Sequence, residues 1–257
     1  KKKIVFANTA LFMKTDFFFK RIHSLTGLGL ALFLLIHLWT NAQVAWAVWG
    51  ENTWFVKSVN TINTLPFLQA LELILLALPF LLHGYLGWQM SIRSRYLVLE
   101  GDGGVPSLGD LPSNRLYTWQ RWTGMALLGL VIWHVWEMRV WKRPIPIPSG
   151  GEGAMVPHLV ALAEGGEIVI SSFGEGIIRV LQEMFQSIWM CILYSSFVVI
   201  ASYHAARGVF TAGITWGVLI HSKQRDRWWI CSQLFFVLFV GLGMLAIWSL
   251  YFFGESV

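Results

Sequence analysis

Four histidines lie deep inside apolar stretches of the chain: His37, His83, His134 and His204. Their surroundings read FLLIHLWT, FLLHGYLGW, GLVIWHVWEM and VIASYHAARG. An ionisable side chain inside a membrane segment is costly, and it usually faces the protein interior, a cavity or a cofactor. A lone histidine of this kind could equally be a hydrogen-bonded core residue. Four histidines in four separate stretches instead indicate a shared role, and imidazole is the commonest metal ligand in proteins.

The stretches that carry these histidines have the composition of membrane spans. Of the 257 residues, 56% are hydrophobic and 13% are charged, whereas a soluble domain has about 25% charged residues. A spanning helix needs about 20 apolar residues. We therefore predict a single all-α integral membrane domain over residues 1–257, a five-helix bundle. The five helices are expected at about 18–46, 65–91, 117–140, 176–209 and 227–253.

The basic residues predict the orientation of this bundle. An inside N-terminus assigns segments 1–21, 93–121 and 207–227 to the cytoplasm, and they hold fourteen of the 19 Lys and Arg residues. This positive-inside bias explains the net charge of +5 better than nucleic-acid binding does. Cys191 and Cys231 sit in different apolar stretches and are expected to be small buried hydrophobes rather than a disulfide.

The first and third predicted helices share the pattern T-G-x9-H. Its members are Thr26, Gly27 and His37 in one helix, and Thr123, Gly124 and His134 in the other. A hydrogen-bonding residue, His23 or Gln120, stands 14 positions before each histidine. At about 100° per residue these positions fall on one face of each helix, so a stripe leads from a polar end to a histidine.

The second and fourth helices share a weaker pattern, H-[GA]-x-x-G. It comprises His83, Gly84 and Gly87 in one helix, and His204, Ala205 and Gly208 in the other. Small residues beside a histidine let a bulky, flat group approach the backbone. Ordinary small-residue packing between membrane helices would give the same pattern.

Depth in the membrane then predicts two histidine pairs. His37 and His134 lie near the outer ends of outward-running helices, and His83 and His204 lie near the inner ends of inward-running ones. Haem iron takes one axial nitrogen on each face, so each pair could hold one b-type haem. Zinc would need three or four ligands, and a proton relay would not require a repeat. We call His37 and His134 the outer pair, and His83 and His204 the inner pair.

Polar residues at the inner ends of the helices are candidate partners for haem propionates. They are His23, Ser24, Gln120, Arg121 and Arg207. Arginine binds carboxylates by charge-assisted hydrogen bonds. For Arg121 and Arg207, a role as positive-inside anchors is the alternative interpretation.

With these features the chain resembles the two-haem cytochrome b membrane-anchor subunits of succinate:quinone oxidoreductases, the succinate dehydrogenases and quinol:fumarate reductases. The resemblance lies in five helices, histidines in the first four, and the segment HSLTGLGLALFLLIH, and it extends over residues 16–252.

The resemblance implies an outer haem b on His37 and His134 and an inner haem b on His83 and His204. It also implies a flavoprotein (FAD) subunit and an iron–sulfur subunit docked on the cytoplasmic face, where the three basic segments would form the dock. A quinone, often menaquinone in this family, would react near the outer haem. The location implied is the bacterial cytoplasmic membrane, with a cytoplasmic N-terminus.

Several acidic positions bear on quinone and proton chemistry. Glu72, the sole formal charge of the second helix, lies 11 residues outward of His83 and is a candidate base for the quinone, with a structural hydrogen bond as the alternative. Glu137 and Glu183 are expected to be interfacial charges. Ser202 stands where some fumarate reductases carry a proton-conducting glutamate, so such a route is not expected here. The long loop 141–175 is a candidate cover for the quinone site.

Two other functions are compatible with parts of this pattern. A transporter or proton-conducting protein without metal could contain a helix repeat. A cytochrome b anchor of a hydrogenase or formate dehydrogenase would place its ligands on helices with different spacing. The T-G-x9-H repeat favours the succinate:quinone oxidoreductase interpretation over both.

Overall fold

A computed structural model describes residues 2–49, 53–99, 112–142, 145–147, 158–163, 166–170 and 172–254. Two compact units are distinguished in it. Unit 1 comprises Lys1–Phe33, Glu72–Leu128 and Ala201–Phe236, and unit 2 comprises Leu34–Leu71, Gly129–Ile200 and Val237–Val257. Several long helices contribute residues to both units. The single domain expected from the sequence stays a prediction.

The predicted membrane spans are confirmed in part. Among the described residues, four helical segments are long and apolar enough to cross a membrane: Phe17–Trp46, Leu68–Ile92, Ile188–Thr215 and Ser222–Phe253. The first lies in α1 (Lys2–Ala42) and η1 (Gln43–Trp49), and the second in α3 (Leu68–Glu72), η2 (Leu73–Ala77) and α4 (Leu78–Leu99). The other two are α7 (Ile188–Thr215) and α8 (Ser222–Phe253). The chain is therefore described as a multi-pass membrane protein.

The third predicted span is helical but less apolar than the other four. It forms α5 (Pro112–Trp136) and continues as η3 (Glu137–Trp141), a π-helical turn. Its charge-free part, residues 122–136, is shorter than the roughly 20 residues that a span needs. Arg121 and Glu137 flank that part. For this reason length and hydropathy alone do not identify α5 as a membrane span.

The second predicted span is interrupted close to Glu72. Phe67 adopts a φ of 57°, and α3 starts at the next residue. The π-helical turn η2 then separates Glu72 from α4. A π turn advances less than 100° per residue, so the shared face assumed for Glu72 and His83 does not apply to this backbone.

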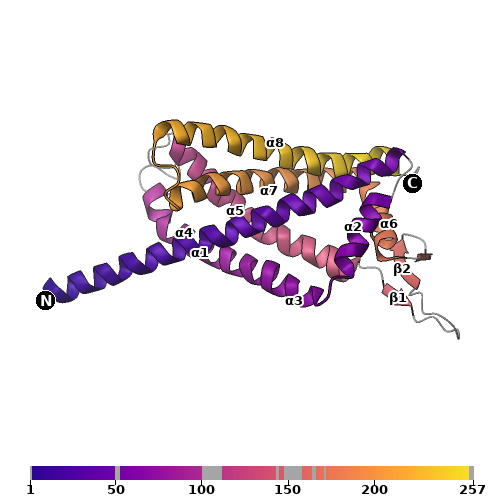
Figure 1. Cartoon of the computed structure of the whole chain (residues 1–257), viewed down its shortest axis with the longest axis horizontal. Helices are drawn as coiled ribbons and strands as arrows, with labels where there is room; N and C mark the ends of the chain where they lie inside the picture. The colour runs from indigo at the N-terminus through magenta and orange to yellow at the C-terminus, as the bar shows by residue number, and fades with distance from the viewer. Residues whose placement is uncertain are drawn as a thin grey trace. The chain divides into compact units, whose positions relative to one another are not determined.

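The prediction of one fourth helix over 176–209 is wrong, because the chain forms two helices there. The amphipathic α6 (Phe173–Phe185) begins at the N-cap Ser172, whose hydroxyl accepts a hydrogen bond from the Glu175 amide. It ends before Gln186, and α7 follows. Between the first two predicted spans the chain forms another helix, α2 (Thr53–Asn63), which lies beside α6 (Figure 1). The Asn60 side chain accepts a hydrogen bond of 2.7 Å from the Gly174 amide.

A small antiparallel sheet makes the all-α prediction incomplete. Its strands, in the order β1-β2-β3, are β1 (Ile145–Ile147), β2 (His158–Ala163) and β3 (Gly166–Ile170). Val160 is the partner of both Ile145 and Val169. The β-branched residues here favour strands, and alternating proline excludes a helix in β1. The rest of the 141–175 loop, at 148–157, and the Gly/Pro-rich segment 100–111 lie outside the described residues.

Buried apolar side chains from α2, α6, α7 and α8 form the core of unit 2. Its fully or almost fully buried members include Phe55, Leu181, Phe185, Cys191, Tyr194 and Leu250. Cys191 is a buried free thiol, as expected from the sequence. Cys231 is also free but exposed, so the expectation of burial is wrong for it.

The close packing of α6 on α2 predicts that Gly174 cannot be enlarged without cost. A Cβ at this position would lie 2.7 Å from the Val56 carbonyl oxygen, which is backbone and cannot rotate away. We expect Gly174→Ala to lower the free energy of unfolding by about 1–3 kcal/mol, the usual cost of overpacking. Gly241→Ala is the control, since its Cβ would meet nothing within 4 Å. Thermal unfolding in detergent would measure both, and equal melting temperatures would contradict the prediction.

Candidate functional site

The imidazoles of the inner pair face one another in unit 1. His83 comes from α4 and His204 from α7, and their ring centroids are 6.2 Å apart. The ring planes stand at 88° to each other. Histidines that are 121 positions apart in the sequence are thus brought together, as the depth argument predicted.

A reciprocal pair of hydrogen bonds joins His83 to α1. The His83 Nδ1 lies 2.9 Å from the His23 carbonyl oxygen, and the His23 Nδ1 lies 3.1 Å from the His83 carbonyl oxygen. The two rings stack with centroids 3.9 Å apart. The Thr26 hydroxyl is 3.4 Å from the His83 Nδ1. We call this arrangement the α1–α4 clasp.

The same arrangement recurs between α5 and α7. The His204 Nδ1 lies 3.1 Å from the Gln120 carbonyl oxygen, and the Gln120 side-chain amide donates a hydrogen bond of 3.0 Å to the His204 carbonyl. The Thr123 hydroxyl is 3.2 Å from the His204 Nδ1. Gln120 therefore takes the place that His23 has in the α1–α4 clasp, and we call this second arrangement the α5–α7 clasp.

Both clasps determine which ring nitrogen carries the proton. A carbonyl oxygen only accepts, so the Nδ1 of His83 and of His204 must be the donor. The Nε2 of each neutral ring then carries the lone pair and is the atom available to a metal. The T-G element of the repeat thus contacts the histidine of the next membrane span, His83 for α1 and His204 for α5. The sequence interpretation, which assigned it to a stripe leading to its own histidine, did not identify this partner.

The glycines of both patterns make room for these side chains. A Cβ on Gly27 would lie 2.6 Å from the His83 Cε1, and one on Gly124 would lie 2.9 Å from the His204 Cε1. A Cβ on Gly87 would lie 3.2 Å from the His23 Cε1, and one on Gly208 would lie 3.8 Å from the Gln120 Nε2. The space beside Gly87 and Gly208 was expected to admit a bulky, flat group. Side chains of the neighbouring helix lie there instead.

The other predicted polar residues have different surroundings. The Ser24 hydroxyl accepts a hydrogen bond from the Trp216 indole, and the Arg121 guanidinium donates to the Ser91 carbonyl. Arg207 is only 7% exposed and lies over the rings of Phe210 and Trp229. Its Nε and Nη1 lack a hydrogen-bond partner in the described part of the chain. A buried guanidinium in this state is suited to an anionic group.

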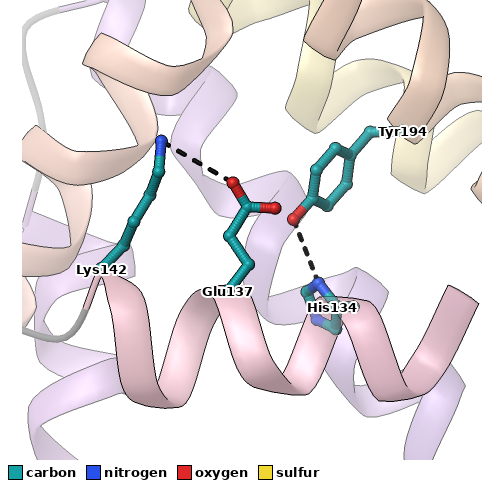
Figure 2. A network of polar contacts seen from close by, with 4 residues as sticks. All are labelled: His134, Glu137, Lys142 and Tyr194. Atoms are coloured by element: carbon teal, nitrogen blue, oxygen red, sulfur yellow. Dashed lines mark hydrogen bonds and ion pairs between the residues drawn. The ribbon is translucent and has the colours of Figure 1, made fainter.

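The outer pair lies in unit 2. The ring centroids of His37 and His134 are 6.0 Å apart, and their planes stand at 75°. His134 is flanked by Tyr194 and Phe197, and its Nδ1 is 3.2 Å from the Tyr194 hydroxyl (Figure 2). Sequence reasoning missed Tyr194, because it stands in an apolar run with no repeat or motif to distinguish it.

The carboxylates do not all have the surroundings expected of them. The Glu137 side chain is 13% exposed and lies 3.8 Å from the Lys142 ammonium, so the interfacial interpretation does not describe it fully. Glu183 lies at the end of α6, before the spanning α7 begins. Glu72 is half-buried in unit 1. Ser202 is fully buried, and in the described part of the chain its hydroxyl has no hydrogen-bond partner.

Comparison with known proteins gives one relevant similarity. No family model matches the chain. The succinate dehydrogenase cytochrome b558 subunit of Bacillus subtilis (strain 168) is 24% identical to it over 235 residues, which cover 91% of this chain and 96% of the relative. The similarity is therefore to a whole subunit. It confirms the resemblance to the cytochrome b anchors of succinate:quinone oxidoreductases.

The close contact at Gly27 predicts a selective effect on the inner pair. In Gly27→Ala the new methyl group forces the His83 ring to move, because only 2.6 Å separates the two positions. We expect the occupancy of a metal group on the inner pair to fall roughly 10- to 100-fold, as for other changes around a ligand. Gly29→Ala is the matched control, since nothing lies within 4 Å of its Cβ. Haem content per chain would measure both, and equal content would contradict the prediction.

Proposed function

We propose that this chain is the haem-bearing membrane anchor of a succinate:quinone oxidoreductase, and that it passes electrons between a membrane quinone and an iron–sulfur subunit. The observation that carries the proposal is the spacing of the histidine rings. Two pairs in two separate units have almost the same separation, 6.2 Å and 6.0 Å.

This separation fits a metal bound between two imidazoles. Metal–imidazole bonds are about 2 Å long, and the ring centroid lies roughly 1 Å behind the bonding nitrogen. Two imidazoles opposed across one ion should therefore have centroids roughly 6 Å apart. Rings in direct van der Waals stacking would lie closer, as His23 and His83 do at 3.9 Å.

The donor set favours haem over an ion held by protein alone. Among the described residues, no group of three or more His, Cys, Asp or Glu side chains could hold a metal ion. Zinc sites use three or four protein ligands, whereas a porphyrin supplies the equatorial ligands and needs only two axial ones. The clasps leave the Nε2 of His83 and His204 as the coordinating atoms. The name of the relative, a cytochrome b558 subunit, supports haem b.

The polar residues of unit 1 would bind the haem on the inner pair. Arg207 is one turn beyond His204, and its buried N–H groups have no hydrogen-bond partner among the described residues, so we propose it as the main contact for a propionate. Gln120 and His23 orient the ligands rather than bind propionates. Haem b held between the two histidines of a pair would supply reversible one-electron transfer. The residues of this chain would hold it and orient the histidine rings.

The dicarboxylate chemistry belongs to other subunits in this proposal. The relative is named as part of a succinate dehydrogenase, which supports association with a flavoprotein and an iron–sulfur subunit. We propose that the basic segments 1–21, 93–121 and 207–227 bind the iron–sulfur subunit at the cytoplasmic face of the bacterial membrane. Acidic surfaces on that partner would be attracted to these lysines and arginines.

A groove in unit 2 is suited to the quinone. It has a volume of about 420 Å³ and is lined by α1, η1 and α2. Trp39 and Trp54 contribute flat apolar walls, and Gln43, Lys57 and Ser58 contribute polar groups. A quinone head needs both, because its ring is apolar and its two oxygens accept hydrogen bonds. Menaquinone, which the sequence resemblance implies, stays a prediction.

The alternative functions have less support. A metal-free transporter would not require two histidine pairs with rings about 6 Å apart. The anchor of a hydrogenase or formate dehydrogenase shares the haems, but the similarity over 91% of the chain is to a succinate dehydrogenase subunit.

Each histidine pair should give one redox component. We expect His83→Ala to remove only the component of the inner pair and His37→Ala only that of the outer pair, because each variant deletes one axial ligand. His221→Ala, at an exposed position, is the control. Redox titration of the purified complex, followed by visible absorbance, measures both components. Loss of the same component in both variants would refute the pairing.

Glu72 and the groove should differ in how they affect quinone turnover. A lost base lowers kcat, roughly 100-fold or more, whereas a lost binding contact raises KM. We expect Glu72→Gln to lower kcat and Lys57→Met to raise KM for a soluble quinone, with both haems retained. Steady-state kinetics of the assembled complex would test this. Wild-type kcat in Glu72→Gln would exclude Glu72 as a required base, and a wild-type KM in Lys57→Met would exclude the groove.

A further inference from the structure

His134 of the outer pair differs from both histidines of the inner pair in what its imidazole Nδ1 contacts. In the inner pair, His83 and His204 each face a backbone carbonyl oxygen. In the outer pair, the Nδ1 of His134 faces the hydroxyl of Tyr194 instead, at 3.2 Å. A carbonyl can only accept a hydrogen bond. A hydroxyl accepts a hydrogen bond and can also donate one to a further acceptor.

Tyr194 is held firmly in the core of unit 2. Its side chain is 7% exposed and packs against Trp133 and Phe185, with ring centroids 5.2 Å away in both cases. A second aromatic ring, Phe197, lies across His134 at 5.7 Å. The phenol therefore has little freedom, and its hydroxyl is presented to the imidazole in one orientation.

A carboxylate lies on the other side of the same hydroxyl. Figure 2 shows the Tyr194 oxygen between the His134 ring and the Glu137 carboxylate, close enough for the carboxylate charge to act on the phenol. The buried Oε2 of Glu137 has no hydrogen-bond partner in the described part of the chain. The other oxygen, Oε1, lies 3.8 Å from the Lys142 ammonium.

The local backbone brings these groups together. Glu137 follows His134 by three positions and so lies on the same side of the helix. The π-helical turn η3 starts at Glu137, and the Lys142 amide donates a hydrogen bond of 2.8 Å to the Glu137 carbonyl. Because of this wider turn, Lys142 lies one turn after Glu137, and the lysine side chain is beside the Glu137 carboxylate.

If the Nε2 of His134 binds a metal, the positions of the hydrogens on His134 and Tyr194 are determined. The Nδ1–H then donates to the Tyr194 oxygen, and the Tyr194 O–H is available to the Glu137 carboxylate. Hydrogen bonding of this kind makes an imidazole a stronger electron donor, and a carboxylate at the end of the series strengthens the effect. A stronger axial donor stabilises the oxidised metal and lowers its potential.

We propose that Tyr194 and Glu137 are positioning residues that act in series on His134, orienting its imidazole and lowering the potential of the outer haem. The proposal rests on the proposed function, since it requires a haem on the outer pair. It assigns to the ligands of one chain different means of tuning: backbone carbonyls for His83 and His204 of the inner pair, and a phenol backed by a carboxylate for His134 of the outer pair.

Tyr194→Phe in the assembled complex is the principal test. We expect the midpoint potential of the outer haem to rise and that of the inner haem to stay unchanged, because the His134 Nδ1–H loses its acceptor. The control is Tyr251→Phe, a tyrosine of the same unit that contacts Trp248 and Phe252. An unchanged outer potential in a variant that retains its haems would overturn the proposal.

A double-mutant cycle with Glu137→Gln separates action through Tyr194 from a direct effect of charge. Removing the carboxylate should raise the midpoint potential of the outer haem in the wild-type background. In the Tyr194→Phe background it should cause no further rise, because the hydroxyl between Glu137 and His134 is already missing. Equal shifts in both backgrounds would mean that Glu137 acts on the haem directly and would overturn the series. If Tyr194→Phe loses the outer haem, Glu137→Gln decides by two readouts, the potential and the paramagnetic resonance signal of the outer haem. A raised potential with a changed signal supports action through the His134 ring, whereas an unchanged potential, or a raised potential with an unchanged signal, overturns the proposal.

The paramagnetic resonance signal of the oxidised outer haem gives a second readout that does not depend on turnover. It depends on the relative orientation of the two axial imidazoles, so it should change in Tyr194→Phe and not in Tyr251→Phe. The same measurements separate this proposal from the proposed function. A wild-type complex without haem on the outer pair would contradict the function, whereas two haems with unchanged potentials in the variants would contradict only the role of Tyr194 and Glu137.

Discussion

The hydrogen bond from the Nδ1 of a membrane histidine to a backbone carbonyl is the interaction on which the inner site depends. It assigns the ring proton, leaves the Nε2 as the atom with the lone pair, and joins two helices that contribute to the same unit. In a membrane no water is present to bind a ring nitrogen, so a nitrogen without a hydrogen bond would cost free energy. Each clasp therefore satisfies the Nδ1 and also orients the histidine for the site. His83 and His204 meet this requirement in the same way.

The repeat in the sequence corresponds to a repeat of helix pairs. In each pair, one helix contributes a threonine, a glycine and a reciprocal donor, and the other contributes the histidine. The reciprocal donor is His23 in one pair and Gln120 in the other, which indicates that hydrogen bonding, and not charge, is required there. The glycine is needed because the imidazole lies where its Cβ would be. The two patterns recognised separately in the sequence are thus the two halves of one interaction.

Much of this could be predicted from the sequence, and the reasons for the remainder are physical. Histidine type, spacing and depth predicted both pairs, since these depend on helix geometry alone. The partner of Thr26 could not be predicted, because it depends on which helix packs against which. The role of Tyr194 was missed because a tyrosine in an apolar run has no periodicity of its own. The break between α6 and α7 and the small sheet fall in stretches where hydropathy is a poor guide. The π-helical turns near Glu72 and Glu137 likewise leave no pattern in the sequence.

We propose that each chain binds two haems, one between the histidines of each pair. The ratio of extractable haem b to polypeptide in the purified complex decides this, measured by haemochrome absorbance against quantitative amino-acid analysis. We expect two haems per chain. A ratio of one would leave one of the 6 Å histidine pairs without its group, and a ratio of zero would refute haem binding by both pairs.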